Sequence, residues 1–279
     1  MIIDTHHHYW QYNPVEFDWI DDEMATIRRS FLPSDLQQTL SAADVQGVIS
    51  VQARQTLEET DWLLHLAAEN TFMYGVVAWL PLASVEISDV LAQYVSNPWL
   101  KGVRHVVQGE PDPEFLLRDD FDRGISRLKD FNLVYDLLIF ERQLPNTIRF
   151  VDRHPNQVFV LDHIAKPQIK AGTLQPWERN IRELAKRSNV CCKLSGMVTE
   201  ADYKTWTSEQ LQPYFDVVLE AFGPQRLLFG SDWPVCLVAT EYSAWLSLVK
   251  KQLATLSHYE QELIFSKNAI QTYQLKKTA

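Results

Sequence analysis

The segment Met1-Ile-Ile-Asp-Thr-His-His-His8 is a short, β-branched apolar run that ends in three histidines. Runs that are apolar without strict alternation are typical of strands buried on both faces of a parallel sheet. Seven similar runs follow it along the chain. The eight runs together are Met1–His6, Gly47–Gln52, Met73–Leu82, Lys101–Val107, Val134–Phe140, Val158–Ile164, Asn189–Gly196 and Arg226–Trp233. Eight parallel strands are the number that closes a barrel.

Helix patterns lie between these runs. Thr56 and Glu59 have the spacing of a capping box, and Pro176 stands where a helix would begin. The alternation of strand and helix patterns predicts an α/β fold in which residues 1–279 form a single (β/α)8 TIM barrel domain. The alternative is a doubly wound open sheet, but Asp4–His8 occupies the place where that fold has its glycine-rich phosphate turn.

Composition narrows the class of protein. The chain has 279 residues, of which 46% are hydrophobic and 22% charged, so it can bury a full core. A formal net charge of −10 disfavours nucleic acid as a partner. We expect no membrane partner and a cytoplasmic location, because the sequence shows neither a signal-peptide pattern nor an apolar run of membrane-spanning length. The three cysteines, which are Cys191, Cys192 and Cys236, fit a reduced compartment.

Ionisable residues stand at three of the predicted strand ends, where barrel enzymes carry their catalytic groups. The first run ends with His6 and His8, which alternation places on one face of the strand. His163 lies near the end of the sixth run and Asp232 near the end of the eighth. Each has an ordinary alternative, namely a tag remnant, a hydrogen-bonded core histidine, and a carboxylate in a turn. A closed barrel brings all four to one mouth, and this joint pattern favours a functional site.

The same strand ends carry a family resemblance. The segments concerned are Ile3–His8, Lys101–His105, Asp162–Pro167, Lys193–Gly196 and Gly230–Pro234. Through them the chain resembles the amidohydrolase superfamily, and within it the branch of sugar-lactone lactonases that includes L-fuconolactonases and L-rhamnonolactonases. The resemblance covers nearly the whole chain and implies a metal-dependent-hydrolase-like barrel. The catalytic core that it implies consists of His6, His8, His163 and Asp232.

The chain differs from the two-metal members of this superfamily, and the difference bears on how many metal ions it could bind. Two-metal members of the superfamily place a carboxylated lysine or a glutamate late in the fourth strand and a histidine at the end of the fifth. Here Lys101 begins the fourth run, and Val134–Phe140 contains no histidine. Metal-independent action, in which histidines polarise the carbonyl directly, and a single divalent ion, best Zn²⁺, both remain open. The residues that would hold one ion are His6, His8, His163 and Asp232.

Cations and aromatic rings near the strand ends suit an oxygen-rich sugar. Arg104 and Lys166 rank first, because they lie inside the segments that carry the resemblance. Lys193 has a plainer interpretation, since it can pair with a carboxylate of the barrel. The residues that we expect to bind substrate are Arg54, Arg104, His105, Lys166, Trp10 and Trp233.

The function hypothesis is hydrolysis of a sugar-acid lactone, an aldonolactone such as L-fucono- or L-rhamnono-lactone. Asp232 would take a proton from the water that attacks the lactone carbonyl, and the histidines would stabilise the oxyanion. Two alternatives are a zinc-dependent decarboxylase or C–C hydrolase with the same strand-end residues, and a non-catalytic barrel that binds a sugar acid. In each case the partner is a small molecule, and the sequence sets no oligomeric state.

Overall fold

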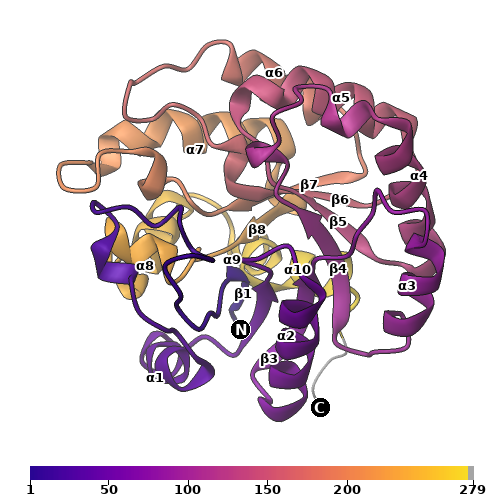
Figure 1. The fold of residues 1–279 in the computed structure, drawn as a ribbon. Coiled ribbons are helices and arrows are strands. Elements are labelled where there is room, and N and C mark those ends of the chain that lie inside the picture. The colour runs from indigo at the N-terminus through magenta and orange to yellow at the C-terminus, as the bar shows by residue number, and fades with distance from the viewer. Residues whose placement is uncertain (276–279) are drawn as a thin grey trace.

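The structure is a computed structural model that describes residues 1–275, and it shows eight parallel strands ringed by helices (Figure 1). The strands are β1 (Ile3–His7), β2 (Gly47–Val51), β3 (Met73–Ala78), β4 (Leu100–His105), β5 (Val134–Leu137), β6 (Phe159–Leu161), β7 (Val190–Leu194) and β8 (Leu227–Phe229). Each strand pairs with the next one in the chain. Backbone bonds from Asp232 N to His6 O and from His8 N to Trp233 O, both 2.7 Å, close the ring. The predicted TIM barrel is confirmed.

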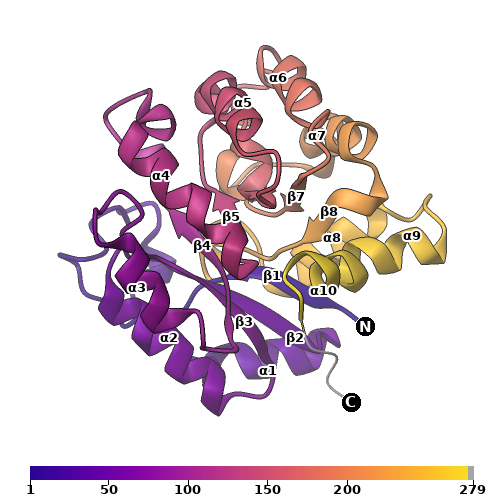
Figure 2. The ribbon, with the colours of Figure 1, turned by 90° about the vertical axis from the view of Figure 1, so that its right-hand side faces the viewer.

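Helices form the outer layer of the barrel. In the side view they lie outside the strands, while α10 contacts β8 (Figure 2). None of the helices within residues 1–275 is both long and apolar enough to cross a membrane. The α-helices are α1 (Pro33–Ala43), α2 (Leu57–Glu69), α3 (Ile87–Tyr94), α4 (Asp119–Leu128), α5 (Leu144–Arg153), α6 (Trp177–Leu184), α7 (Ser208–Phe222), α8 (Tyr242–Gln252), α9 (His258–Glu262) and α10 (Asn268–Thr272).

Helix α2 begins directly after Thr56, as the sequence predicts, but the capping box is only half formed. Thr56 Oγ1 accepts a hydrogen bond from the backbone N–H of Glu59 at 3.2 Å. The Glu59 carboxylate does not return to Thr56. It accepts instead from the backbone N–H groups of Ala53 at 3.0 Å and Arg54 at 2.8 Å. Glu59 therefore fixes the loop that leads from the mouth of the barrel into α2.

Strands β6 and β8 end earlier than the sequence predicts. His163 has a φ of 52° and Asp232 a φ of 59°, whereas strand residues need a negative φ. L-residues rarely take this left-handed conformation, because it places Cβ too close to the carbonyl oxygen. His163 opens a run of four such residues that ends at Lys166. The two residues thus leave their strands through strained turns, which apolar patterning alone does not reveal.

The barrel interior is closed by a segment from far along the chain. Ile3, Ile49 and Val134 belong to a buried apolar cluster inside the barrel, and Tyr273 joins this cluster from the segment after α10. Tyr273 is 1% exposed, and its hydroxyl lies 2.9 Å and 3.1 Å from the two carboxylate oxygens of Asp136 on β5. The amphipathic phenol suits this place because its ring packs on apolar residues while its hydroxyl has a partner. The polar groups above this apolar floor therefore stand on a closed base.

Candidate active site

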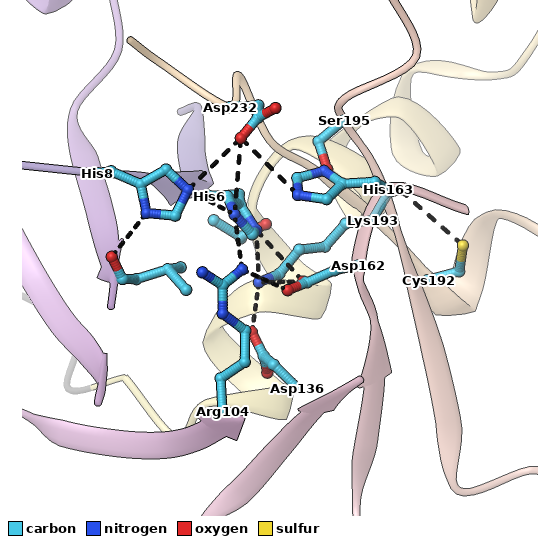
Figure 3. A network of polar contacts seen from close by, with 12 residues as sticks. His6, His8, Arg104, Asp136, Asp162, His163, Cys192, Lys193, Ser195 and Asp232 are labelled. Atoms are coloured by element: carbon cyan, nitrogen blue, oxygen red, sulfur yellow. Dashed lines mark hydrogen bonds and ion pairs between the residues drawn. The ribbon is translucent and has the colours of Figure 1, made fainter. Parts of the chain in front are cut away.

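Three imidazoles and one carboxylate converge at the carboxyl ends of β1, β6 and β8 (Figure 3). His6 Nε2 lies 3.2 Å from His8 Nε2. Asp232 Oδ1 lies 3.5 Å from His8 Nε2 and 3.8 Å from Nε2 of both His6 and His163. All four side chains are buried. The structure thus brings together the four residues that the sequence singles out, and we call His6, His8, His163 and Asp232 the mouth cluster.

Neighbouring groups fix the orientation of two imidazole rings. His8 Nδ1 lies 2.8 Å from the carbonyl oxygen of Val51. Because a carbonyl oxygen only accepts, His8 Nδ1 carries a hydrogen, and the other ring nitrogen, Nε2, faces Asp232. His163 Nδ1 is hydrogen-bonded to Ser195 Oγ at 2.8 Å. Gly196, with a φ of 63°, permits this approach, since a Cβ there would lie only 2.5 Å from His163 Nδ1.

Burial sets the charge of the mouth cluster. It lowers the pKa of His163 to about 4 and takes the pKa of His6 well below its ordinary value, so both rings are neutral at neutral pH. Burial also opposes ionisation of Asp232, but the nearby His163 and the contact with His8 keep the pKa of this carboxyl below its usual range. The cluster therefore presents one carboxylate, a proton acceptor, beside the neutral imidazoles of His6 and His163.

A second polar layer lies beneath the mouth cluster (Figure 3). Arg104 Nη1 donates to Asp162 Oδ2 at 2.9 Å and lies 3.3 Å from His6 Nε2. Lys193 Nζ donates to Asp136 Oδ2 at 2.5 Å and lies 3.0 Å from Asp162 Oδ1. It is also 3.2 Å from His6 Nδ1. We call Arg104, Asp136, Asp162 and Lys193 the lower layer.

The two basic and two acidic side chains of the lower layer pair with one another, as buried charges must. Burial raises the pKa of Asp136 to about 6, against the opposing charge of Lys193. Burial acts the same way on Asp162, but the charges of Lys193 and Arg104 and the hydrogen bond with His6 hold its pKa well below the usual range. The sequence-based interpretation of Lys193 as the partner of a barrel carboxylate agrees with this arrangement.

Two of the predicted substrate-binding cations lie at or under the mouth cluster. Arg104 is 3% exposed, and its guanidinium also donates to the side-chain oxygen of Gln52 at 3.0 Å and to the Gln52 carbonyl oxygen. Lys166 lies at the rim, where its Nζ is 3.7 Å from Glu200 Oε1. Glu200 ends a 3₁₀ turn, Val198–Glu200, that follows β7. Sequence reasoning missed Glu200, because it stands outside every segment of the family resemblance and in no local pattern.

Three other predicted residues, Trp10, Arg54 and Trp233, lie in the segments that follow β1, β2 and β8. Arg54 and Trp10 line a cavity of about 390 Å³ between the β1–α1 segment and α2. Arg54 is paired there with Glu16 at 2.8 Å, while Trp10 is 1% exposed and its indole donates to a backbone carbonyl. The ring of Trp233 packs edge-on against Phe31, 5.2 Å between ring centres. The rings of Trp10 and Trp233 are therefore buried in contacts with other parts of the protein, and neither presents an exposed face to a substrate.

His105 lies away from the mouth cluster. Its ring stacks on Phe115, with ring centres 4.8 Å apart, and its Nε2 is 2.6 Å from Glu110 Oε1. Trp79 donates its indole N–H to the other ring nitrogen at 3.3 Å. Neighbouring residues of a strand point to opposite faces, so Arg104 points into the barrel and His105 towards the helices. The alternation that groups His6 with His8 could have separated this pair in the sequence.

Three donor atoms of the mouth cluster, His6 Nε2, His8 Nε2 and Asp232 Oδ1, are spaced to fit a single metal ion. Their separations of 3.2–3.8 Å resemble the spacing of about 3.4 Å between ligands of a tetrahedral ion with bonds of about 2.1 Å. Within residues 1–275, His6, His8 and Asp232 form one group of potential ligands. A second group joins His6 and His163 to Asp162. Because the Asp162 oxygens already contact cations of the lower layer, the first group is the better donor set.

A parallel eight-stranded barrel with imidazole and carboxylate donors at its carboxyl mouth defines a hydrolase-type TIM barrel with a possible metal site. The model of the amidohydrolase family matches residues 3–275. The chain belongs to this family, as the sequence resemblance indicates.

Individual relatives extend this assignment. The chain is 38% identical over 288 residues to an L-fucono-1,5-lactonase of Burkholderia multivorans, covering 99% of this chain and 97% of the relative. It is 35% identical over 248 residues to an L-fucono-1,5-lactonase of Burkholderia ambifaria, covering 88% and 85%. The crystal structure of an amidohydrolase from Burkholderia multivorans with bound Zn has a TM-score of 0.96 to this chain, at 38% identity over 99% of this chain and 100% of that chain.

Proposed function

We propose that the protein is a lactonase that opens a sugar lactone such as L-fucono-1,5-lactone. The observation that carries the proposal is the mouth cluster itself, in which an ionised carboxylate stands 3.5–3.8 Å from three imidazole nitrogens. A carboxylate accepts a proton from water, and imidazoles stabilise charge on a carbonyl oxygen. The likeness to two L-fucono-1,5-lactonases supports the choice of a sugar lactone as the class of substrate.

In the first half-reaction Asp232 acts as the general base. It removes one proton from water while the water oxygen bonds to the lactone carbonyl carbon and the carbonyl electron pair moves to oxygen. Arg104 lies 3.3 Å from His6 Nε2 and adds fixed positive charge below the developing oxyanion. His6, His8 and His163 surround the place where this charge forms.

In the second half-reaction the tetrahedral intermediate collapses. The carbonyl bond re-forms, the ring C–O bond breaks, and the electron pair leaves with the ring oxygen. Asp232, now protonated, returns its proton to that oxygen, so the carboxylate is regenerated. The product is the open-chain hydroxy acid, and no co-reactant other than water is needed.

A divalent ion fits the same residues, and the related Burkholderia multivorans amidohydrolase has a structure with bound Zn. When bound, such an ion supplies Lewis acidity at the carbonyl oxygen. The residues that would hold it are His6, His8 and Asp232, and His163, whose Nε2 lies 3.8 Å from Asp232 Oδ1, would be the fourth. His8 and His163 are suited to this role, because hydrogen bonds at Nδ1 leave Nε2 directed at the cluster.

The test is proton release from a panel of five- and six-membered aldonolactones by the purified protein, as isolated and after chelation. We expect rapid opening of L-fucono-1,5-lactone by the wild type and a loss of about 10²–10⁴-fold in Asp232→Asn. Asp216→Asn, an exposed carboxylate on α7, is the matched control and should leave the rate unchanged.

Two outcomes would contradict or refine the proposal. Unimpaired activity in Asp232→Asn would exclude this mechanism. If the folded wild type opens no lactone of the panel, the decarboxylase or sugar-acid-binding alternatives are favoured. Retained activity after chelation assigns carbonyl polarisation to the residues of the chain, whereas loss that added Zn²⁺ restores assigns it to the metal.

A further inference from the structure

Glu200 at the rim of the mouth has unused hydrogen-bonding capacity. Its side chain is 22% exposed, and its polar contact within residues 1–275 is with Lys166 Nζ at 3.7 Å. Charge-assisted N–H···O bonds are about 2.7–2.9 Å long, so this separation leaves both groups able to bind something else. Lys166 has a 5.7 Å contact with the ring of Phe140 besides this ion pair. Because the pair is mostly buried and its N–O separation is long, both side chains can still form hydrogen bonds with a polar ligand.

The pair stands at the same mouth as the proposed general base. Lys166 ends the left-handed run that begins at His163. Glu200 ends the 3₁₀ turn after β7, which packs on the 3₁₀ helix Val235–Val238 that follows Asp232. Burial raises the pKa of Glu200; the charge of Lys166 opposes this shift, and the charge of Asp232 adds to it. The three charged groups are therefore near enough to act on one another.

An ammonium and a carboxylate at this distance suit one kind of ligand group. An alcohol can donate its hydrogen to the carboxylate while its oxygen accepts from the ammonium. A ligand carboxylate is less suitable, because the pair has no net charge and the ligand oxygens would face Glu200. The pair therefore matches a hydroxyl group of a neutral sugar better than an acidic substituent.

We propose that Glu200 and Lys166 bind a ring hydroxyl of the lactone and thereby select hydroxylated sugar lactones over plain ones. This inference rests on the proposed lactonase function and names the determinant of its specificity. A site built to bind a hydroxyl group discriminates against a substrate that lacks it, because the polar groups of the site are then left unpaired. Glu200 and Lys166 would thus act on the ratio between two substrates, whereas Asp232 acts on both.

The experiment compares kcat/KM for L-fucono-1,5-lactone with kcat/KM for δ-valerolactone, the six-membered lactone without hydroxyl groups. Wild type, Glu200→Gln and Lys166→Met are measured. We expect each substitution to lower kcat/KM for the sugar lactone about 10- to 100-fold and to change δ-valerolactone opening less than about 3-fold. The matched control is Glu183→Gln, which removes the same charge from the exposed Lys186–Glu183 pair and should change neither rate.

Three outcomes would overturn the inference. Equal losses on both lactones in Glu200→Gln would mean that this residue serves Asp232 and not a substrate hydroxyl. Unchanged rates on both would mean that it does not contact substrate. If the wild type opens neither lactone, the proposed function fails and the inference fails with it. This result differs from an active wild type whose variants keep its rates, which contradicts the inference alone. Circular dichroism and thermal unfolding confirm that each variant is folded before its ratio is interpreted.

Discussion

The mouth cluster and the lower layer are both buried and polar, but they differ in how their groups are partnered. In the lower layer each charge faces an opposite charge, as in the 2.5 Å contact of Lys193 with Asp136. In the mouth cluster His6 and His8 turn Nε2 atoms towards each other at 3.2 Å, and Asp232 lies no closer than 3.5 Å to a histidine nitrogen. Proteins normally satisfy buried polar groups. We infer from this difference that the lower layer supports the fold and that the mouth cluster is arranged to bind a ligand.

The largest expected effect separates activity from stability within the mouth cluster. Asp232→Asn should lower kcat/KM about 10²–10⁴-fold, because the amide cannot take a proton from water. Its unfolding free energy should stay within about 1 kcal/mol of the wild type, since no short ion pair is broken. Urea unfolding and lactone hydrolysis on the same preparation check this. A large loss of stability would erase the contrast between the two layers.

The reverse behaviour is expected in the lower layer. Lys193→Met leaves Asp136 and Asp162 buried without their shared cation, which should cost about 3–5 kcal/mol of unfolding free energy. The matched control is Lys186→Met in an exposed pair with Glu183, which should cost less than about 1 kcal/mol. Denaturant titrations of both variants measure the difference. Equal effects of the two substitutions would show that the lower layer does not carry the fold as described.

A smaller effect is expected from the hydroxyl that closes the lower layer from below. Tyr273→Phe removes the donor to Asp136 but keeps the ring among its apolar neighbours. A lost hydrogen bond to a charged group should cost about 2 kcal/mol of stability. Because Lys193 still holds Asp136, kcat/KM at a temperature well below unfolding should change less than about 3-fold. A strong loss of activity without loss of stability would extend the functional site down to the floor.

The smallest effect concerns pH and a buried carboxyl outside both layers. Burial raises the pKa of Glu59 to about 7 from its ordinary 4.5, so the folded state binds this proton more tightly than the unfolded state. The contribution of Glu59 to stability is therefore greatest at low pH and falls as pH rises towards and through 7. Between pH 6 and 8 this loss should be about 1 kcal/mol. Glu59→Gln should remove that slope, and thermal unfolding across this range measures it. An identical slope in both proteins would contradict the shift.

Much of this organisation could be predicted from the sequence because it depends on periodicity. Apolar runs located all eight strands, and strand alternation joined His6 to His8. The sequence predicts the ends of β6 and β8 too late, because the left-handed turns at His163 and Asp232 interrupt strands whose composition stays apolar. Backbone conformation of this kind depends on tertiary contacts, which apolar periodicity does not encode.

The candidate site was predictable only where residues belong to strand ends. Arg104 and Lys166 stand in segments that resemble the family, and both lie at or under the mouth. His105 shares the segment with Arg104 but faces the helices, a distinction that strand alternation makes. Glu200 arrives from a loop after β7, where spacing predicts neither direction nor partner. Long-range pairing, here with Lys166, becomes visible only in the folded chain.

The position of Tyr273 has a consequence for how the barrel is completed during synthesis. Because α10 follows β8 in the chain, the ribosome makes this tyrosine only after all eight strands. Until then Asp136 lacks one of its two partners and the apolar interior lacks its floor. We expect the nascent barrel to remain loosely packed and open at one end, in the state most exposed to association with other chains. The α10 segment would thus convert a barrel whose strands are already paired into one that is closed at its base.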